Sequence, residues 1–313
     1  MMLPWRIALT LAQVVLLAGL APLLDNLIKT VKARLQRRSG PPLLQGYRDL
    51  RKLLIKESIH ARPTSAIFRL APAVSLTTSL AAAATFPVLA SAALAAPGDV
   101  LTALYVLALG RFFTALAGLD AASAFGGLGS SRDVSLAALV EPVAVVAILV
   151  LAAGMVTPSD GAALAGAGAD LLAPWRLLAA IAFFMVILAE CARVPIDNPA
   201  THLELTMIHE AMLLEYSGRE LACATLAARI KQTVLLAMLA TIFFPIGLGG
   251  AAAPTAAGVG LALLALLGKL AILAILIGVV ESVVAKLRLF RVPDFLGGAF
   301  GIALLAYIAR EAL

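Results

Sequence analysis

Cysteine and histidine are scarce in this chain, and their scarcity excludes several kinds of site. The 313 residues include two cysteines and three histidines. Cys191 and Cys223 lie far apart and form no CxxC pair, so the sequence predicts neither a disulfide framework nor a cysteine-ligated metal or cluster. The apolar segments contain no histidine, which argues against a transmembrane haem.

Charge is also sparse, and this fixes the class of protein. Only 13% of the residues are charged, 62% are hydrophobic, and the mean hydropathy is +1.02. A soluble domain carries roughly 45–50% apolar and about 25% charged residues. The composition therefore predicts an integral membrane protein that crosses the bilayer several times. The net charge of +6 does not indicate nucleic-acid binding, because the basic residues gather in loops on one side.

Long apolar runs predict an all-α fold with about eight transmembrane helices in a single integral membrane domain over residues 1–313. A spanning helix needs roughly 20 apolar residues. The first run is predicted to be a retained helix and not a cleaved signal peptide, because its basic cluster follows it. The predicted spans are about 5–27, 70–95, 100–120, 134–157, 174–193, 224–248, 257–285 and 292–312.

The distribution of lysine and arginine predicts the orientation in the cytoplasmic (inner) membrane. Of the 24 basic residues, 19 fall in segments 28–69, 121–133, 193–231 and 286–291. Loops rich in Lys and Arg stay in the cytoplasm. We therefore expect both termini on the outer side and two long cytoplasmic loops, at about 28–69 and 193–223.

The first loop contains a basic amphipathic segment after the breaker Gly40-Pro41-Pro42. Its apolar residues recur near helical spacing from Leu43 to Ile55, which predicts a helix lying along the membrane surface. This loop either only orients the protein against lipid head groups or docks a partner protein. For docking, the candidate residues in the two loops are Arg37, Arg38, Arg48 and Asp197.

The second loop concentrates acidic residues. Residues 190–220 hold six of the 18 acids, beside two apolar segments. Thr201 and Glu204 fit a capping box, which predicts a short helix over about 202–214 and gives Glu204 a purely structural explanation. His202 and His209 lie seven residues apart, which does not match zinc-protease spacing, so no metal site is predicted.

Four further ionisable residues lie within predicted spans: Arg111, Glu141, Lys269 and Glu281. Such groups are costly in a bilayer and by default mark an ion path or a partner site. Snorkelling toward the interface is the alternative for Arg111 and Glu281. Lys269 and Glu281 are 12 residues apart, roughly 18 Å along a helix. Each therefore needs a partner on another helix, on another subunit or in water.

Three long stretches carry a resemblance to a known family. They are KARLQRRSGPPLLQGYRDLRKLLIKE, LGRFFTALAGLDAASAFGGLGSSRD and AECARVPIDNPATHLELTMIHEAMLLEYSG. The chain resembles the membrane subunits related to respiratory complex I subunit 1, and within them the group 4 [NiFe]-hydrogenase branch typified by formate hydrogenlyase and hydrogenase-4. Residues 195–218 depart from the quinone-reducing branch, which is richer in acids after its Pro-x-Asp.

The resemblance implies a subunit that anchors hydrogenase large and small subunits and iron–sulfur proteins, and joins them to antiporter-like membrane subunits. It implies no cofactor in this chain, with the [NiFe] centre and iron–sulfur clusters in the partners. Acidic residues would begin an ion path. Arg193, one helical turn after Glu190 by spacing, is a candidate for a cation whose movement would load or unload a proton on that carboxylate, and Lys269 is a second candidate. The expected path residues are Glu141, Glu190, Glu204, Glu210 and Glu215, with Arg111, Lys269 and Glu281.

Two other functions remain open at this point. The first is a quinone-site subunit of an NADH:quinone oxidoreductase of the complex I type. The second is a freestanding secondary transporter, for which internal repeats with paired broken helices are typical. The sequence shows no convincing repeat of that kind.

Overall fold

The computed structural model describes residues 3–59, 64–86, 88, 100–152, 172–197, 207–246 and 256–312. These residues form helices joined by turns, with no strand among them. The all-α prediction is therefore confirmed. The predictions for Thr201, His202 and Glu204, including the capping box, lie outside the described residues.

Eight long helices and four short ones make up the described chain. The short ones are α2 (Gln45–Ile55), α8 (His209–Leu213), the π-helix η1 (Leu239–Phe243) and the 3₁₀-helix η2 (Leu289–Arg291). The long helices are α1 (Leu3–Leu35), α3 (Ala66–Thr85), α4 (Val100–Asp120), α5 (Ala124–Ala152), α7 (Pro174–Glu190), α9 (Gly218–Met238), α10 (Ala256–Val283) and α11 (Val292–Ala312).

Each predicted span has a helix at its place. Seven helices in the described chain are long and apolar enough to cross a membrane. The span predicted at 174–193 is α7, whose 17 residues are at the lower limit for spanning. The helix α5 begins about ten residues before the predicted 134, because its first turns pack tightly. A Cβ on Gly129 would lie 2.8 Å from the Ile208 carbonyl oxygen.

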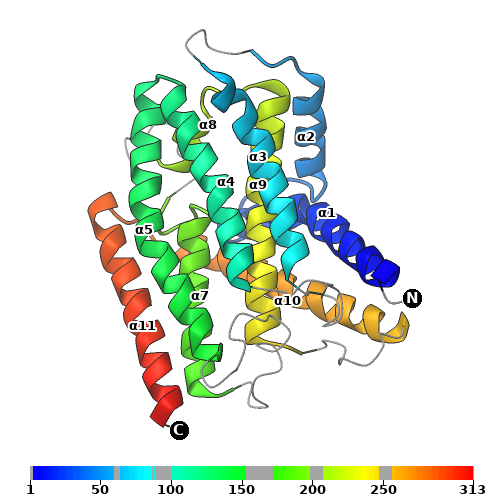
Figure 1. The fold of residues 1–313 in the computed structure, drawn as a ribbon, viewed down its shortest axis with the longest axis vertical. Coiled ribbons are helices and arrows are strands. Elements are labelled where there is room, and N and C mark those ends of the chain that lie inside the picture. The colour runs from blue at the N-terminus through cyan, green and yellow to red at the C-terminus, as the bar shows by residue number, and fades with distance from the viewer. Residues whose placement is uncertain are drawn as a thin grey trace.

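The spans form a bundle in which α9 is central (Figure 1). In the span Gly218–Phe243, which is α9 followed by η1, 78% of the most apolar stretch is buried. The corresponding share is 28–39% in the other candidate spans. Its polar residues Lys231, Gln232 and Thr233 are accordingly buried within the protein. In Figure 1, α1 and α10 run obliquely to the other spans, and these two helices pack together.

The predicted amphipathic helix exists as α2, but its placement differs from the expectation. Figure 1 shows α2 standing beside the first half of α9, roughly parallel to it. Its buried residues are Gly46 and Leu50, and the Arg229 guanidinium of α9 donates to the Gly46 carbonyl at 3.2 Å. The helix α2 thus packs against α9, whereas the sequence predicted that it lies flat along a membrane surface.

The two loops predicted to be cytoplasmic lie together at one end of the molecule. Ser217 Oγ accepts a hydrogen bond from the Ile59 amide at 2.8 Å and donates to its carbonyl at 3.0 Å. Gly218 has φ +52°, and a Cβ there would lie 2.4 Å from the Glu57 carbonyl oxygen, so glycine is required.

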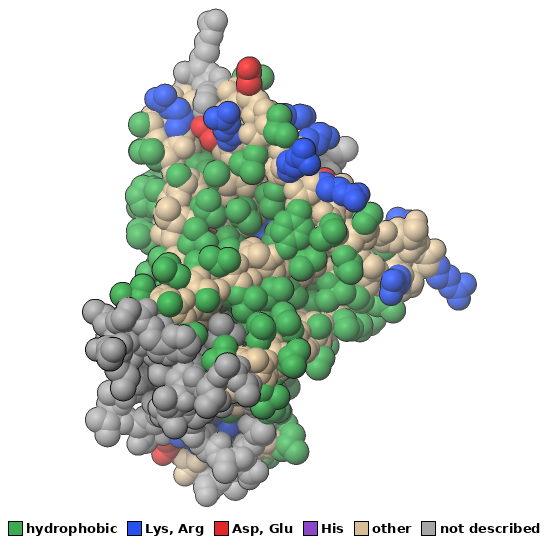
Figure 2. All heavy atoms as spheres, turned by 90° about the vertical axis from the view of Figure 1, so that its right-hand side faces the viewer, with side chains coloured by type: hydrophobic (Ala, Val, Ile, Leu, Met, Phe, Trp, Pro, Cys, Tyr) green, Lys and Arg blue, Asp and Glu red, His purple; other side chains and the backbone are tan. Residues whose placement is uncertain are grey.

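We call this end of the molecule, which includes α2, α8 and the α4–α5 connection, the basic end. Figure 2 shows Lys and Arg along this upper end, above a hydrophobic band, and further Lys and Arg on the projection at the right of the view.

Candidate ion-transfer site

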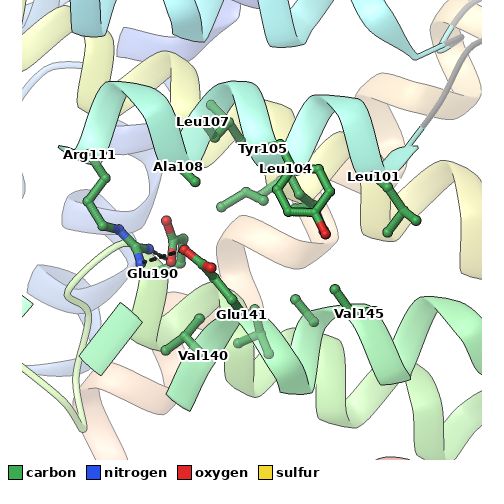
Figure 3. A pocket seen from close by; sticks show the side chains of 13 residues that line it. Leu101, Leu104, Tyr105, Leu107, Ala108, Arg111, Val140, Glu141, Val145 and Glu190 are labelled. Carbon is green, nitrogen blue, oxygen red and sulfur yellow. Dashed lines mark ion pairs between the residues drawn. The ribbon is translucent and has the colours of Figure 1, made fainter. Parts of the chain in front are cut away.

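Arg111 of α4 is surrounded by carboxylates from two other helices. Its guanidinium forms an ion pair with Glu190 at the end of α7. It also lies 3.9 Å from an Asp133 carboxylate oxygen and 4.0 Å from one of Glu141, both on α5. Figure 3 shows Arg111 reaching toward Glu190 and Glu141. The side chain of Arg111, for which snorkelling was the alternative to a place on the ion path, is thus 8% exposed and paired within the protein.

Lys231 of α9 completes this group. Its ammonium lies 2.7 Å from the second Glu190 oxygen, so Glu190 is held by two cations from two helices. A buried pair is weak support for stability, but removal of one partner leaves an uncompensated charge. We call Arg111, Asp133, Glu141, Glu190 and Lys231 the Arg111 network.

Glu141 differs from the rest of the network in its exposure. Its side chain is 50% exposed, whereas that of Glu190 is 10% exposed. It lines a narrow slot between α4 and α5, whose other walls include Leu104, Tyr105 and Val145 (Figure 3). A half-exposed carboxylate among apolar residues of a spanning helix is costly against lipid. Glu141 is therefore the end of the network that lies at the surface of the bundle.

A second group of charges surrounds Arg193, and we call it the Arg193 network. Its guanidinium lies 2.7 Å from Asp25 of α1 and 3.4 Å from Glu281 of α10, and it donates to the Gln232 side-chain oxygen at 2.6 Å. Asp25 also pairs with Lys29 and Arg229, and Glu281 with Lys32. Of the three kinds of partner left open for Glu281, the structure shows one on another helix, Lys32 of α1.

The expectation that Arg193 stands one helical turn beyond Glu190 is wrong. The helix α7 ends at Glu190, and Ala192, with φ +47°, turns the chain out of the helix. Arg193 is therefore not one helical turn beyond Glu190. It binds Asp25 and Glu281 instead.

A cavity of about 350 Å³ has charged residues of both networks among its lining. This volume has room for about ten waters at roughly 30 Å³ each. Glu190, Arg193, His209 and Glu210 are among the residues that line it. Of the predicted path residues, Glu190 and Glu210 thus meet at one cavity, while Glu215 lies partly buried in the turn after α8.

Lys269 is separate from both networks. Its ammonium donates to the carbonyls of Ala240 and Phe244 at 2.9 Å and of Ile246 at 3.1 Å. An ammonium has three donors, and all three are used at the end of η1. This geometry favours a role in holding a helix end, and the predicted ion-path role of Lys269 stays a prediction.

The predicted docking residues differ in their exposure. Arg37, Arg38 and Arg48 are exposed at the basic end. Asp197 is 2% exposed. It pairs with Lys286 at 3.1 Å and accepts from the Ile208 amide at 3.0 Å, so it ties the second loop to the α10–α11 connection.

Several charged members of the two networks were not singled out from the sequence. Asp25 and Asp133 stand within one turn of a predicted span edge, where a charge is normally read as part of a loop, and a search of those edges would have found both. Arg229 and Lys231 lie further inside the predicted span 224–248 and were counted with the basic residues of the second loop. His209, which lies beside Asp133, was considered only as a metal ligand.

Comparison with known proteins places this arrangement in a family. The model of the family described as NADH dehydrogenase matches residues 7–310. Formate hydrogenlyase subunit 4 of Escherichia coli (strain K12) is 34% identical over 96% of this chain and 98% of its own length. Hydrogenase-4 component C of the same strain is 32% identical over 97% and 96%.

Other matches are more partial or more distant. An NADH-quinone oxidoreductase subunit of Paraburkholderia xenovorans (strain LB400) is 31% identical over 69% of this chain and 63% of its own length. A chain in the structure of the membrane-bound sulfane sulfur reductase, an archaeal respiratory membrane complex, matches with a TM-score of 0.79. It is 19% identical and covers 97% of this chain and 99% of that one, which shows a shared fold.

Proposed function

This chain belongs to the NADH dehydrogenase family, that of respiratory complex I subunit 1, and we propose that it is the membrane-anchoring and ion-coupling subunit of a membrane-bound [NiFe]-hydrogenase complex. That it is a membrane subunit of a respiratory-type complex follows from its relatives. The hydrogenase branch is supported by near-full-length identity to two hydrogenase-related proteins, against a partial match to the NADH-quinone oxidoreductase relative.

The observation that carries the coupling role is the Arg111 network. It brings Arg111, Glu190 and Lys231 from three helices into contact within the bundle, and extends to the half-exposed Glu141. Ionisable groups in that position mark ion or proton paths. Ions would enter from the 350 Å³ cavity and leave toward an antiporter-like membrane subunit packed beside Glu141.

The basic end would dock the soluble arm. Arg37, Arg38 and Arg48 are exposed there, and so are the apolar side chains of Leu44 and Ile55. Interleaved basic and apolar residues suit a partner surface with acidic and apolar patches. The partners would be hydrogenase large and small subunits and iron–sulfur proteins, which would hold the [NiFe] centre and the clusters.

A second candidate is a quinone-site subunit of an NADH:quinone oxidoreductase, which the 31% identity to the Paraburkholderia relative supports. Copurification separates the two. The chain is tagged at its C-terminus, extracted in mild detergent, and its partners are identified by mass spectrometry. A nickel–iron protein is expected. Partners that oxidise NADH, with no nickel protein, would favour the second candidate.

Charge reversal tests the docking surface. Arg37→Glu combined with Arg38→Glu should release the soluble arm from membranes at physiological salt while the anchor stays folded. The matched control is Arg288→Glu with Arg291→Glu, two exposed arginines in the α10–α11 connection, outside the two loops. Retention of the arm in the first variant, or equal loss in both, contradicts the docking assignment.

A further inference from the structure

His209, the first residue of α8, occupies a junction between three cavities. It lines the 350 Å³ cavity and two small ones behind it, of about 40 and 10 Å³. Both small cavities also border Arg111 and Asp133. Among the described residues, His209 alone lines all three. Its side chain therefore stands between the water-sized spaces beside the Arg111 network and the large cavity.

The imidazole faces the network through Asp133. Nδ1 of His209 lies 3.5 Å from one Asp133 oxygen, and the other oxygen lies 3.9 Å from Arg111. Both distances exceed those of direct hydrogen bonds. The His209 Nδ1 and that second oxygen of Asp133 are buried without a hydrogen-bond partner. A small shift would bring His209 and Asp133 into a direct hydrogen bond, and the 10 Å³ cavity that both residues line is close to the space that one water requires.

The surroundings of His209 favour the neutral imidazole. Burial lowers the pKa of His209, Asp133 opposes that shift, and Lys231 and Arg111 add to it, while Asp197 opposes it more weakly. The adjacent Glu210 lines the same large cavity. A neutral imidazole has one nitrogen that accepts a proton and one that donates.

We propose that His209 relays protons between the 350 Å³ cavity and Asp133 of the Arg111 network, an inference that rests on the proposed coupling function. A hydronium ion in the cavity gives a proton to one ring nitrogen and becomes water. The imidazolium then gives the proton on Nδ1 to the Asp133 carboxylate. The ring is left neutral as the other tautomer and resets by rotation, while Asp133 loses its charge and its attraction to Arg111.

Chemical rescue distinguishes a relay from a structural role. His209→Ala leaves a gap beside the 350 Å³ cavity that added imidazole can enter, whereas His209→Asn keeps a polar group but cannot relay. In the intact complex in sealed vesicles, both variants should lower ion translocation per turnover by ~10-fold or more, because a positioned proton-transfer group contributes about 10²–10⁴ in rate. Imidazole should restore translocation in His209→Ala only. Leu213→Ala, which enlarges the same cavity, is the control and should show neither loss nor rescue.

The outcomes separate this inference from the proposed function. Normal translocation per turnover in both His209 variants overturns the relay, and so does a loss in His209→Ala that imidazole does not rescue. If the wild type translocates and Glu190→Gln does not, the coupling function stands whatever the His209 result. A wild-type complex that turns over without translocating ions overturns both.

Discussion

The Glu190 carboxylate lies 2.7 Å from the Lys231 ammonium, and its other oxygen contacts the Arg111 guanidinium. One carboxylate thus holds α7, α4 and α9 together at the level of the 350 Å³ cavity. If Glu190 accepts a proton, both contacts lose their charge attraction at once. This links proton loading to the packing of three helices, which is what a coupling device requires.

A double-mutant cycle tests the Glu190–Lys231 contact. Glu190→Gln and Lys231→Gln each change the size of the side chain little. Each removes one charge of the pair and leaves the other charge without this partner. The double variant should lose less thermal stability than the two single losses added together, by about 0.5–3 kcal/mol, as for residues in contact. The melting midpoint of the purified complex provides the measurement. Strict additivity would show that the two groups do not interact.

The three hydrogen bonds of Lys269 favour a role in assembly over the ion-path role expected from the sequence, and one variant decides between the two. Lys269→Met removes three hydrogen bonds to the carbonyls that end η1, and a bond to a charged group contributes about 1.5–3 kcal/mol. The yield of complex should fall. Translocation per turnover of the complex that does assemble should equal that of the wild type. Normal yield with lost translocation would instead place Lys269 in the ion path.

His209 should also give the protein a sensitivity to acid. Its pKa is lowered by burial from an ordinary value of about 6.5. The unfolded state therefore binds the proton first as pH falls, so folded stability declines as pH drops through about 6.5. The melting midpoint measured from pH 8 to 5.5 should fall less in His209→Asn than in the wild type. Parallel curves for the two proteins would contradict the stated environment of His209.

Single-cysteine labelling checks the orientation. In a chain in which Cys191 and Cys223 have been replaced, Ser39→Cys at the basic end should react with a membrane-impermeant reagent only from the cytoplasmic side. Leu172→Cys, at an exposed position just before α7, should react only from the outer side. Reaction of Ser39→Cys from outside would reverse the predicted topology.

The spans were predictable because bilayer thickness and hydropathy act on local sequence. The span 100–120 coincides with α4, and 292–312 with α11. The start of α5 was not predictable, since its glycine- and serine-rich first turns are helical only because they pack closely on α8 and α4, as at Gly129 and Ser130. Ser130 donates to the Ala115 carbonyl of α4 at 2.8 Å.

The sequence predicted some of the buried charges of the two networks but not which charges pair. Burial cost identifies Arg111, Glu190 and Glu281 from sequence, but it does not say which helices are neighbours. The contact of Arg111 with Glu190, and of Arg193 with Asp25, depends on helix packing across the bundle. The helical spacing assumed between Glu190 and Arg193 failed because α7 ends between them.

Ion translocation per turnover in sealed vesicles, compared between the wild type and Glu190→Gln, tests the central claim most directly. Turnover with an artificial electron donor and the yield of complex are measured on the same vesicles. The account predicts normal yield and normal turnover with translocation lost in Glu190→Gln. Normal translocation per turnover in that variant, and in Glu141→Gln, Glu210→Gln and Glu215→Gln, would contradict it, as would a loss of activity that merely follows a loss of assembled complex.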